Sequence, residues 1–168
     1  NLTGMFEAEE FDAVLHLAAE THVDLSIKNP SIFVQTNVLG TQNLLDLSLK
    51  YNISKFIHIS TDEVYGHLDL EAPGFTEATA LAPRSPYSAS KAGSDMLVQS
   101  YHETFGLHTC ITRCSNNYGP HQDATKLLPK TMLNALTGKN IPVYGKGQNI
   151  RDWLYVEDHV AAIFKVFE

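Results

Sequence analysis

The sequence has few cysteines, no long apolar run and no surplus of basic residues. Cys110 and Cys114 are the only cysteines among 168 residues, which is too few for a disulfide-stapled secreted domain and favours a reducing, cytoplasmic setting. No apolar run approaches the roughly 18 residues of a membrane-spanning helix. Twelve Lys and Arg against 19 Asp and Glu give a net charge of −7. We therefore expect a cytoplasmic protein that binds neither membrane nor nucleic acid.

What the sequence does contain is typical of a globular domain. Its 43% hydrophobic and 18% charged residues suffice for a sizeable core. The eight histidines show no metal-ligand spacing, so we expect no metal site. Asn1 is not Met and Glu168 falls within an expected helix, so we expect a piece of a longer chain.

Strand and helix patterns alternate along the chain. A helix from Pro30 to about Asn52 should bury one apolar side, comprising Val34, Val38, Leu44, Leu45 and Leu49. A second helix from Pro86 to Phe105 should stop at Gly106. The NNYGP stretch (116–120) should break the preceding strand. The remaining expected elements are strands at 12–19, 55–60, 107–114, 142–144 and 153–156, and helices at 127–136 and from 157 onward.

This alternation predicts an α/β fold, a Rossmann-like doubly wound parallel sheet that is truncated at both ends. In such sheets ligands bind beyond the carboxyl ends of the strands. Three polar segments follow strands, at 18–21, 60–65 and 115–118. Three polar strand ends on one edge favour a binding site over three unrelated turns.

One strand end carries an unusual set of side chains. In STDEVYG (60–66), a hydroxyl, two adjacent carboxylates and a phenol follow an apolar run. Adjacent carboxyl groups in a partly desolvated site separate their pKa values, so that one can act as an acid and the other as a base. A solvated turn or a helix N-cap is the simpler alternative for Asp62-Glu63 alone. We interpret Tyr65 as a packing or site-lining residue.

The stretch YSASK (87–91) offers a second reactive pair. On a helix, Tyr87 and Lys91 share one face. A nearby ammonium favours the phenolate and makes Tyr87 a usable base near neutral pH. An ordinary Tyr and Lys on a surface helix is the alternative, because YxxxK often occurs by chance.

Taken together, these motifs resemble those of the nucleoside-diphosphate-sugar 4,6-dehydratases, within the extended short-chain dehydrogenase/reductase family, and most closely the branch that acts on dTDP-glucose. TDEVYG is the discriminating motif, because relatives that only epimerise or reduce usually lack the Asp-Glu pair. The matching stretches span nearly the whole chain: HLAAETHVD (16–24), TNVLGT (36–41), STDEVYG (60–66), SPYSASKA (85–92), SNNYGP (115–120), KLLP (126–129), PVYGKG (142–147) and IRDWLYVEDH (150–159).

The resemblance implies an NAD-dependent lyase. Such enzymes oxidise the glucosyl ring at C4, eliminate water across C5 and C6 and return hydride to C6, which gives the 4-keto-6-deoxy sugar. It also implies roles: Tyr87 is the oxidation base, Asp62 protonates the departing C6 hydroxyl and Glu63 removes the C5 proton. Thr61 binds the sugar's 4-oxygen, and Lys91 holds the nicotinamide ribose and tunes Tyr87.

Further positions carry over from the same resemblance. The cofactor-binding set is Ala18, Ala19, Thr36, Ser60, Tyr87, Lys91 and Asn117. The substrate-binding set is Thr21, Thr61, Asn116, Lys126, Leu127, Pro142, Tyr144 and Arg151. Two alternatives stay open: a simple turn at Asn116-Asn117, and a surface ion pair of Arg151 with Asp152 or Glu157. Thr125 departs from the family, which usually has Glu there, and Gly145-Lys-Gly147 is expected to be a turn.

A glycine-rich dinucleotide loop is not found in the sequence. We therefore expect residues 1–168 to form a single partial domain: the C-terminal half of an NAD-binding Rossmann-like domain and the beginning of a nucleotide-sugar-binding portion. The isolated chain should bind NAD weakly or not at all and turn over little. The full-length protein should be a homodimer that binds dTDP-glucose or a similar nucleotide sugar. Two other functions stay open: another NAD-dependent nucleotide-sugar dehydratase, epimerase or decarboxylase, and a non-catalytic nucleotide-sugar-binding protein.

Overall fold

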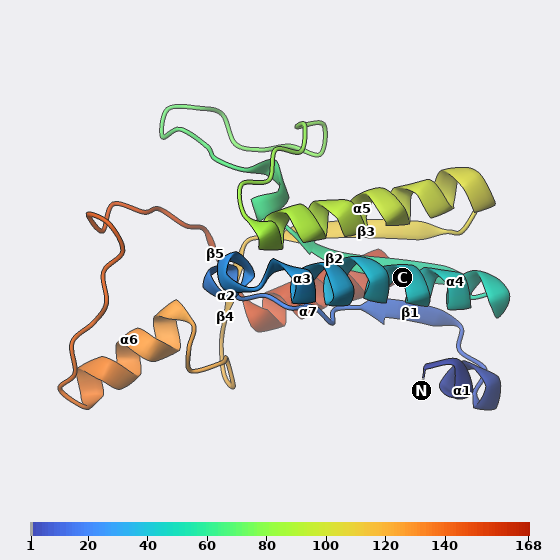
Figure 1. The fold of residues 1–168 in the computed structure, drawn as a ribbon, viewed down its shortest axis with the longest axis horizontal. Coiled ribbons are helices and arrows are strands. Elements are labelled where there is room, and N and C mark those ends of the chain that lie inside the picture. Colours follow the sequence, from blue (N-terminus) through green and yellow to red (C-terminus); the bar gives the residue numbers. More distant parts are fainter. Residues whose placement is uncertain (1) are drawn as a thin grey trace. The chain divides into compact units, whose positions relative to one another are not determined.

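The computed structural model describes residues 2–168, which divide into two compact units, 2–113 and 114–168 (Figure 1). The larger unit is built on a three-stranded sheet in the order β1 (Ala13–His16), β2 (Lys55–Thr61), β3 (Thr109–Cys114). β1 and β2 run parallel, with His16 opposite His58. The α/β, Rossmann-like fold class is thereby confirmed, although β1 ends at His16, before the predicted boundary at residue 19.

The connection from β1 to β2 is largely helical. After α2 (Val23–Lys28), one continuous helical run consists of α3 (Pro30–Phe33), the π-helical segment η1 (Val34–Leu39) and α4 (Gly40–Lys50). A π-helical segment inserts residues relative to an α-helix and shifts the buried face. The prediction that Val34 is buried is therefore wrong, since its side chain is 49% exposed and Phe33 is buried instead. A short helix, α1 (Leu2–Ala8), precedes β1.

Helix α5 (Pro86–Phe105) joins β2 to β3 and has the predicted bounds. Ser85 caps its start in a capping box: the Ser85 hydroxyl accepts from the Ser88 N–H, and the Ser88 hydroxyl accepts from the Ser85 N–H, both at 3.0 Å. Gly106 ends the helix in the left-handed conformation. These local signals explain why the sequence alone predicted this helix well.

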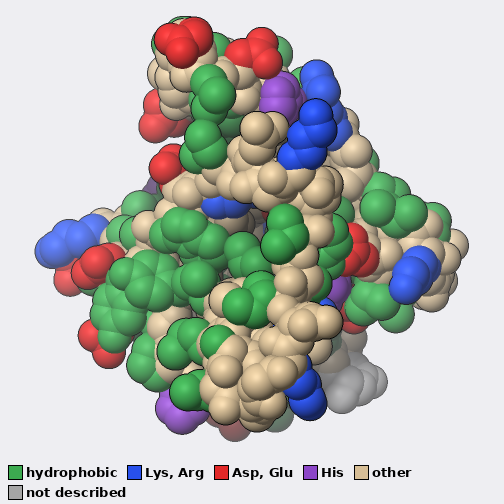
Figure 2. Space-filling view, turned by 90° about the vertical axis from the view of Figure 1, so that its left-hand side faces the viewer, with side chains coloured by type: hydrophobic (Ala, Val, Ile, Leu, Met, Phe, Trp, Pro, Cys, Tyr) green, Lys and Arg blue, Asp and Glu red, His purple; other side chains and the backbone are tan. Residues whose placement is uncertain are grey.

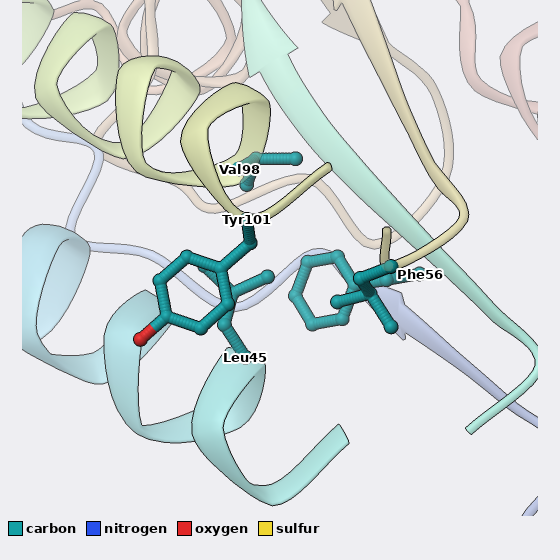
Figure 3. Close-up of a cluster of buried hydrophobic side chains, with 5 residues drawn as sticks. Leu45, Phe56, Val98 and Tyr101 are labelled. Atoms are coloured by element: carbon teal, nitrogen blue, oxygen red, sulfur yellow. The ribbon is translucent and has the colours of Figure 1, made fainter. Parts of the chain in front are cut away.

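The core of the larger unit lies between its helices and the sheet (Figure 3). Leu45 of α4, Phe56 of β2 and Val98 of α5 are fully buried against one another. Tyr101 and Leu107 complete this cluster. The packing fixes α5 against β2, and so fixes the start of the helix near the carboxyl end of the strand.

The smaller unit has its own two-stranded parallel sheet. Strand β4 (Asn116–Tyr118) pairs with β5 (Trp153–Tyr155), so the prediction that 116–120 only interrupts a strand is wrong. No strand forms at 142–144 in the part of the chain that the structure describes, whereas residues 144–147 form the expected turn, with Gly147 N–H bonded to the Tyr144 carbonyl at 3.0 Å. Helices α6 (Leu127–Leu136) and α7 (Val156–Phe167) complete the unit.

Many hydrophobic side chains reach the surface, as one face of the molecule shows (Figure 2). Within residues 2–168, no helix combines the length and the apolar composition that crossing a membrane requires.

Candidate active site

The carboxyl end of β2 presents the Thr-Asp-Glu sequence in a short, capped turn. Thr61 is buried and is the N-cap of the 3₁₀ turn η2 (Asp62–Tyr65), where its hydroxyl accepts from the Glu63 N–H at 3.2 Å. The same hydroxyl donates to Asp62 Oδ1 at 3.3 Å. Asp62 and Glu63 are half-buried. Thr61 therefore performs the capping, and the two carboxyl groups lie within the turn that it caps.

Gly66 ends this turn because no other residue fits. Its φ is +93°, and a Cβ there would lie 2.3 Å from the Ala82 carbonyl oxygen. The chain at 82 returns across η2, where the Ala82 N–H donates to the Val64 carbonyl at 2.9 Å. The final glycine of STDEVYG thus allows the loop at 67–85 to close over the turn that carries Asp62 and Glu63.

Tyr87 and Lys91 lie in the first turns of α5 and are both buried, with side chains 8% and 4% exposed. The alternative of an ordinary surface pair is therefore wrong. The Lys91 ammonium donates to the Ile59 carbonyl of β2 at 2.8 Å. Ala92, the next residue, packs against Val64 and Tyr65 of η2. These contacts bring the Tyr-Lys face of α5 to the strand end that carries Thr61, Asp62 and Glu63.

The ammonium of Lys91 lies among groups that stay neutral. Burial first, and then the charge of Lys91, lower the pKa of His16 to about 4. The same two causes, with smaller contributions from His16 and Arg113, lower the pKa of His58. His16 accordingly acts as a neutral hydrogen-bonding partner of Thr41, at 2.9 Å. Because the imidazoles of His16 and His58 are neutral, the positive charge beside them is that of Lys91.

Asn37 organises the segment after β1, and sequence reasoning did not single it out. Its buried amide accepts from the Glu20 N–H at 2.8 Å and donates to the Glu20 carbonyl at 3.0 Å and to the Ser90 hydroxyl at 2.9 Å. Ser90 in turn donates to the Tyr87 carbonyl at 2.7 Å. Asn37 thus joins the predicted cofactor segment to the start of α5. The signal in the sequence is an amide within the apolar TNVLGT run.

Four other residues of the larger unit were predicted to bind the cofactor: Ala18, Ala19, Thr36 and Ser60. Ala18 is exposed and Ala19 half-buried beside Glu20, the residue that Asn37 holds. Thr36 is half-buried in η1, and Ser60 is buried at the end of β2. Thr21, predicted to bind substrate, is exposed in the segment after β1.

The remaining predicted residues belong to the smaller unit. Arg151 is exposed, and its guanidinium donates to the Ile150 carbonyl at 2.7 Å. Asn117 donates to Cys114 Sγ at 3.3 Å and to the Ser115 carbonyl at 3.1 Å, and its Oδ1 is buried without a hydrogen bond from the residues described. Asn116 and Lys126 are half-buried, whereas the other members of the set are exposed: Leu127, Pro142 and Tyr144.

No cluster of three or more His, Cys, Asp or Glu side chains that could hold a metal ion occurs in the described part of the chain. The groups that come together in the larger unit are hydroxyl, phenol, carboxyl and ammonium groups. Such a set can move protons and bind hydroxyl groups.

Comparison with known proteins identifies what this chain is similar to. The family model described as GDP-mannose 4,6 dehydratase matches residues 1–168. A dTDP-glucose 4,6-dehydratase from Salmonella typhimurium is 53% identical over 98% of this chain and 50% of that protein. A second, from Haemophilus influenzae, is 52% identical over 98% of this chain and 52% of that protein. The chain thus spans about half the length of the curated relatives it matches.

Solved structures show a similarity to the same group of proteins. The crystal structure of DesIV, a dTDP-glucose 4,6-dehydratase from Streptomyces venezuelae with NAD and TYD bound, has a TM-score of 0.92 and 47% identity over 96% of this chain and 50% of that one. A UDP-glucuronic acid 4-epimerase from Bacillus cereus, in complex with UDP-glucuronic acid and NAD, also has a TM-score of 0.92, with 30% identity over 100% of this chain and 52% of that one. The predicted resemblance to nucleotide-sugar dehydratases is confirmed.

Proposed function

Because this chain belongs to the GDP-mannose 4,6 dehydratase family, we propose that its protein is a dTDP-glucose 4,6-dehydratase, an NAD-dependent lyase that forms dTDP-4-keto-6-deoxyglucose. The observation that carries the proposal is the pairing of Asp62-Glu63, in the turn after β2, with the buried Tyr87 and Lys91 of α5. The curated relatives at 52–53% identity bear this enzyme's name.

Each side chain has a task that its surroundings suit. The Tyr87 phenol takes the proton of the sugar's 4-hydroxyl, with the buried ammonium of Lys91 favouring the phenolate. Thr61 binds the 4-oxygen. Glu63 removes the C5 proton, and Asp62 protonates the hydroxyl that leaves C6. Thr61 donates to Asp62 and accepts from the Glu63 N–H, so one hydroxyl orients both residues.

The residues present fit NAD. When bound, NAD accepts one hydride from the sugar and later returns it. Lys91 and Tyr87 would hold the nicotinamide ribose. The buried Oδ1 of Asn117 is an acceptor that a carboxamide or hydroxyl donor would satisfy. The segment of Ala18 and Ala19, fixed through Asn37, would lie along the cofactor.

In this proposal, residues of the smaller unit bind the nucleotide end of the substrate. Lys126 and Arg151 supply positive charge, and the guanidinium suits a pyrophosphate because its N–H groups can bind two oxygens. Leu127, Pro142 and Tyr144 offer exposed apolar surface for the base. Asn116 and Thr21 would contact the sugar. We further propose that the protein acts as a homodimer.

The test is product analysis with the complete gene product, NAD and dTDP-glucose. We expect a sugar nucleotide lighter than the substrate by one water. The matched variants Asp62→Asn and Glu63→Gln keep the size of each side chain, so they should fold, bind NAD and lose product formation by about 100-fold or more. A product of unchanged mass would favour an epimerase, the activity of the Bacillus cereus neighbour at 30% identity. NAD and sugar-nucleotide binding without any product would favour a binding protein.

A further inference from the structure

A buried ionic chain in the larger unit connects the two halves of the proposed catalytic set. Asp95 follows Tyr87 and Lys91 at the same four-residue interval along α5, so the three side chains share one face of the helix. The Asp95 side chain is fully buried. Its Oδ2 accepts from Arg113 Nε of β3 at 2.9 Å. A buried carboxylate is costly unless a cation is fixed beside it, so this pair holds Arg113 in one orientation.

His58 also faces Asp95, with Nε2 3.5 Å from Oδ1. Its pKa is lowered, chiefly by burial, so it stays neutral and Arg113 is the cation that pairs with Asp95. Burial raises the pKa of Asp95, whereas the nearby Ser60 hydroxyl, the ion pair with Arg113 and the charge of Lys91 act in the opposite direction. The ion pair with Arg113 is therefore the contact by which Asp95 can orient a neighbouring side chain.

The other end of the guanidinium reaches η2. Arg113 Nη1 donates to the Tyr65 hydroxyl at 2.9 Å. Tyr65 is buried, stacks on Phe75 with ring centroids 5.1 Å apart, and is the last residue of the turn that begins at Asp62. Thr61 thus fixes the start of the turn by capping, and Arg113 fixes its end. A single 3₁₀ turn has weak internal hydrogen bonds, so anchors at both ends determine how it is oriented.

We propose that Asp95, Arg113 and Tyr65 are positioning residues that orient the Asp62-Glu63 turn against the Tyr87–Lys91 face of α5. The inference rests on the proposed dehydratase function and adds to it. Tyr65 is then more than the packing or site-lining residue that the sequence indicated. Its phenol connects the helix that carries the oxidation base to the turn that carries the elimination pair.

This role predicts a selective defect. Tyr65→Phe removes the acceptor for Arg113 and keeps the ring that stacks on Phe75, so the variant should fold. A displaced turn should slow elimination far more than oxidation, because Lys91 is held by its own bond to the Ile59 carbonyl of β2 and the Tyr87 ring packs against Phe33. We expect kcat to fall by about 10- to 100-fold with KM for the sugar nucleotide changed by less than about twofold.

The experiment is rapid quenching of the complete gene product with NAD, followed by mass analysis of the sugar. Tyr65→Phe should accumulate a sugar that is oxidised at C4 and still carries its C6 hydroxyl. Arg113→Lys keeps a cation beside Asp95 without the guanidinium fork, and should give the same accumulation. Combined, the two changes should cost little more than either alone, because they break one chain. Tyr51→Phe, which removes an exposed phenol that donates to Glu7 at 3.2 Å, is the control and should behave like the parent.

Three results would overturn the inference: kcat of Tyr65→Phe within about twofold of the parent, equal slowing of oxidation and elimination, or effects of the two changes that multiply in full. A parent protein that releases no dehydrated sugar would contradict the proposed function, and this inference with it. A dehydrating parent with an unaffected Tyr65→Phe would contradict this inference alone.

Discussion

Replacing Gly66 by alanine should destabilise the larger unit strongly. At φ +93° a Cβ is strained in any L-residue, which costs about 1–2 kcal/mol. The added carbon would also lie 2.3 Å from the Ala82 carbonyl oxygen. The chain at Ala82 cannot move away easily, because the Ala82 N–H is bonded to the Val64 carbonyl. Steric overlap of this kind adds about 1–3 kcal/mol. The total loss in free energy of unfolding is about 2–5 kcal/mol.

Denaturant unfolding of the complete gene product measures this loss, with Gly74→Ala as the matched control. Gly74 lies in the same loop, and a Cβ there meets nothing within 4 Å. The control should leave the free energy of unfolding within about 0.5 kcal/mol of the parent. A loss below about 1 kcal/mol for Gly66→Ala would refute the close approach of the loop to the turn that carries Asp62 and Glu63.

Two further predictions concern buried polar groups. The pKa of His16 is about 6.5 when unfolded and about 4 when folded, so its contribution of about 3 kcal/mol is complete above pH 6.5 and lost as the pH falls to about 4. Unfolding measured across this range should show this loss. His16→Gln, unlike the exposed His67→Gln, should make the pH dependence less steep, while His58 keeps a dependence of its own. Asn37→Ala leaves the Glu20 N–H without its acceptor and should lower the free energy of unfolding by about 2–4 kcal/mol, as measured with denaturant. A loss no larger than that of the exposed Asn43→Ala would contradict the role assigned to Asn37.

The elements that sequence predicted well are those that local signals define. Helix α5 begins at Pro86 after the Ser85 cap and ends before Gly106, and none of these signals depends on distant residues. The π-helical segment was not predictable in this way, because its register depends on how Phe33 and Asn37 pack against α5. Strand β4 was missed for a similar reason: Asn116–Tyr118 resembles a turn until β5 supplies its hydrogen-bonding partner.

In the candidate site, too, local motifs were predictable from the sequence and contacts between distant segments were not. Asp62-Glu63 and Tyr87-Lys91 are contiguous motifs, so their residue types and spacing identified them. Arg113 carries no motif of its own, and its bridge between α5 and η2 exists only in the folded chain. Buried ion pairs that join distant segments are therefore the part of this site that the sequence could not reveal.

The proposed elimination across C5 and C6 is most directly tested by incubating the complete gene product with dTDP-glucose in deuterium oxide. If Glu63 removes the C5 proton and solvent later replaces it, the dehydrated product should carry one deuterium at C5, and Glu63→Gln should form neither product nor labelled substrate. A dehydrated product without deuterium at C5, or a Glu63→Gln variant that turns over like the parent, would contradict the account.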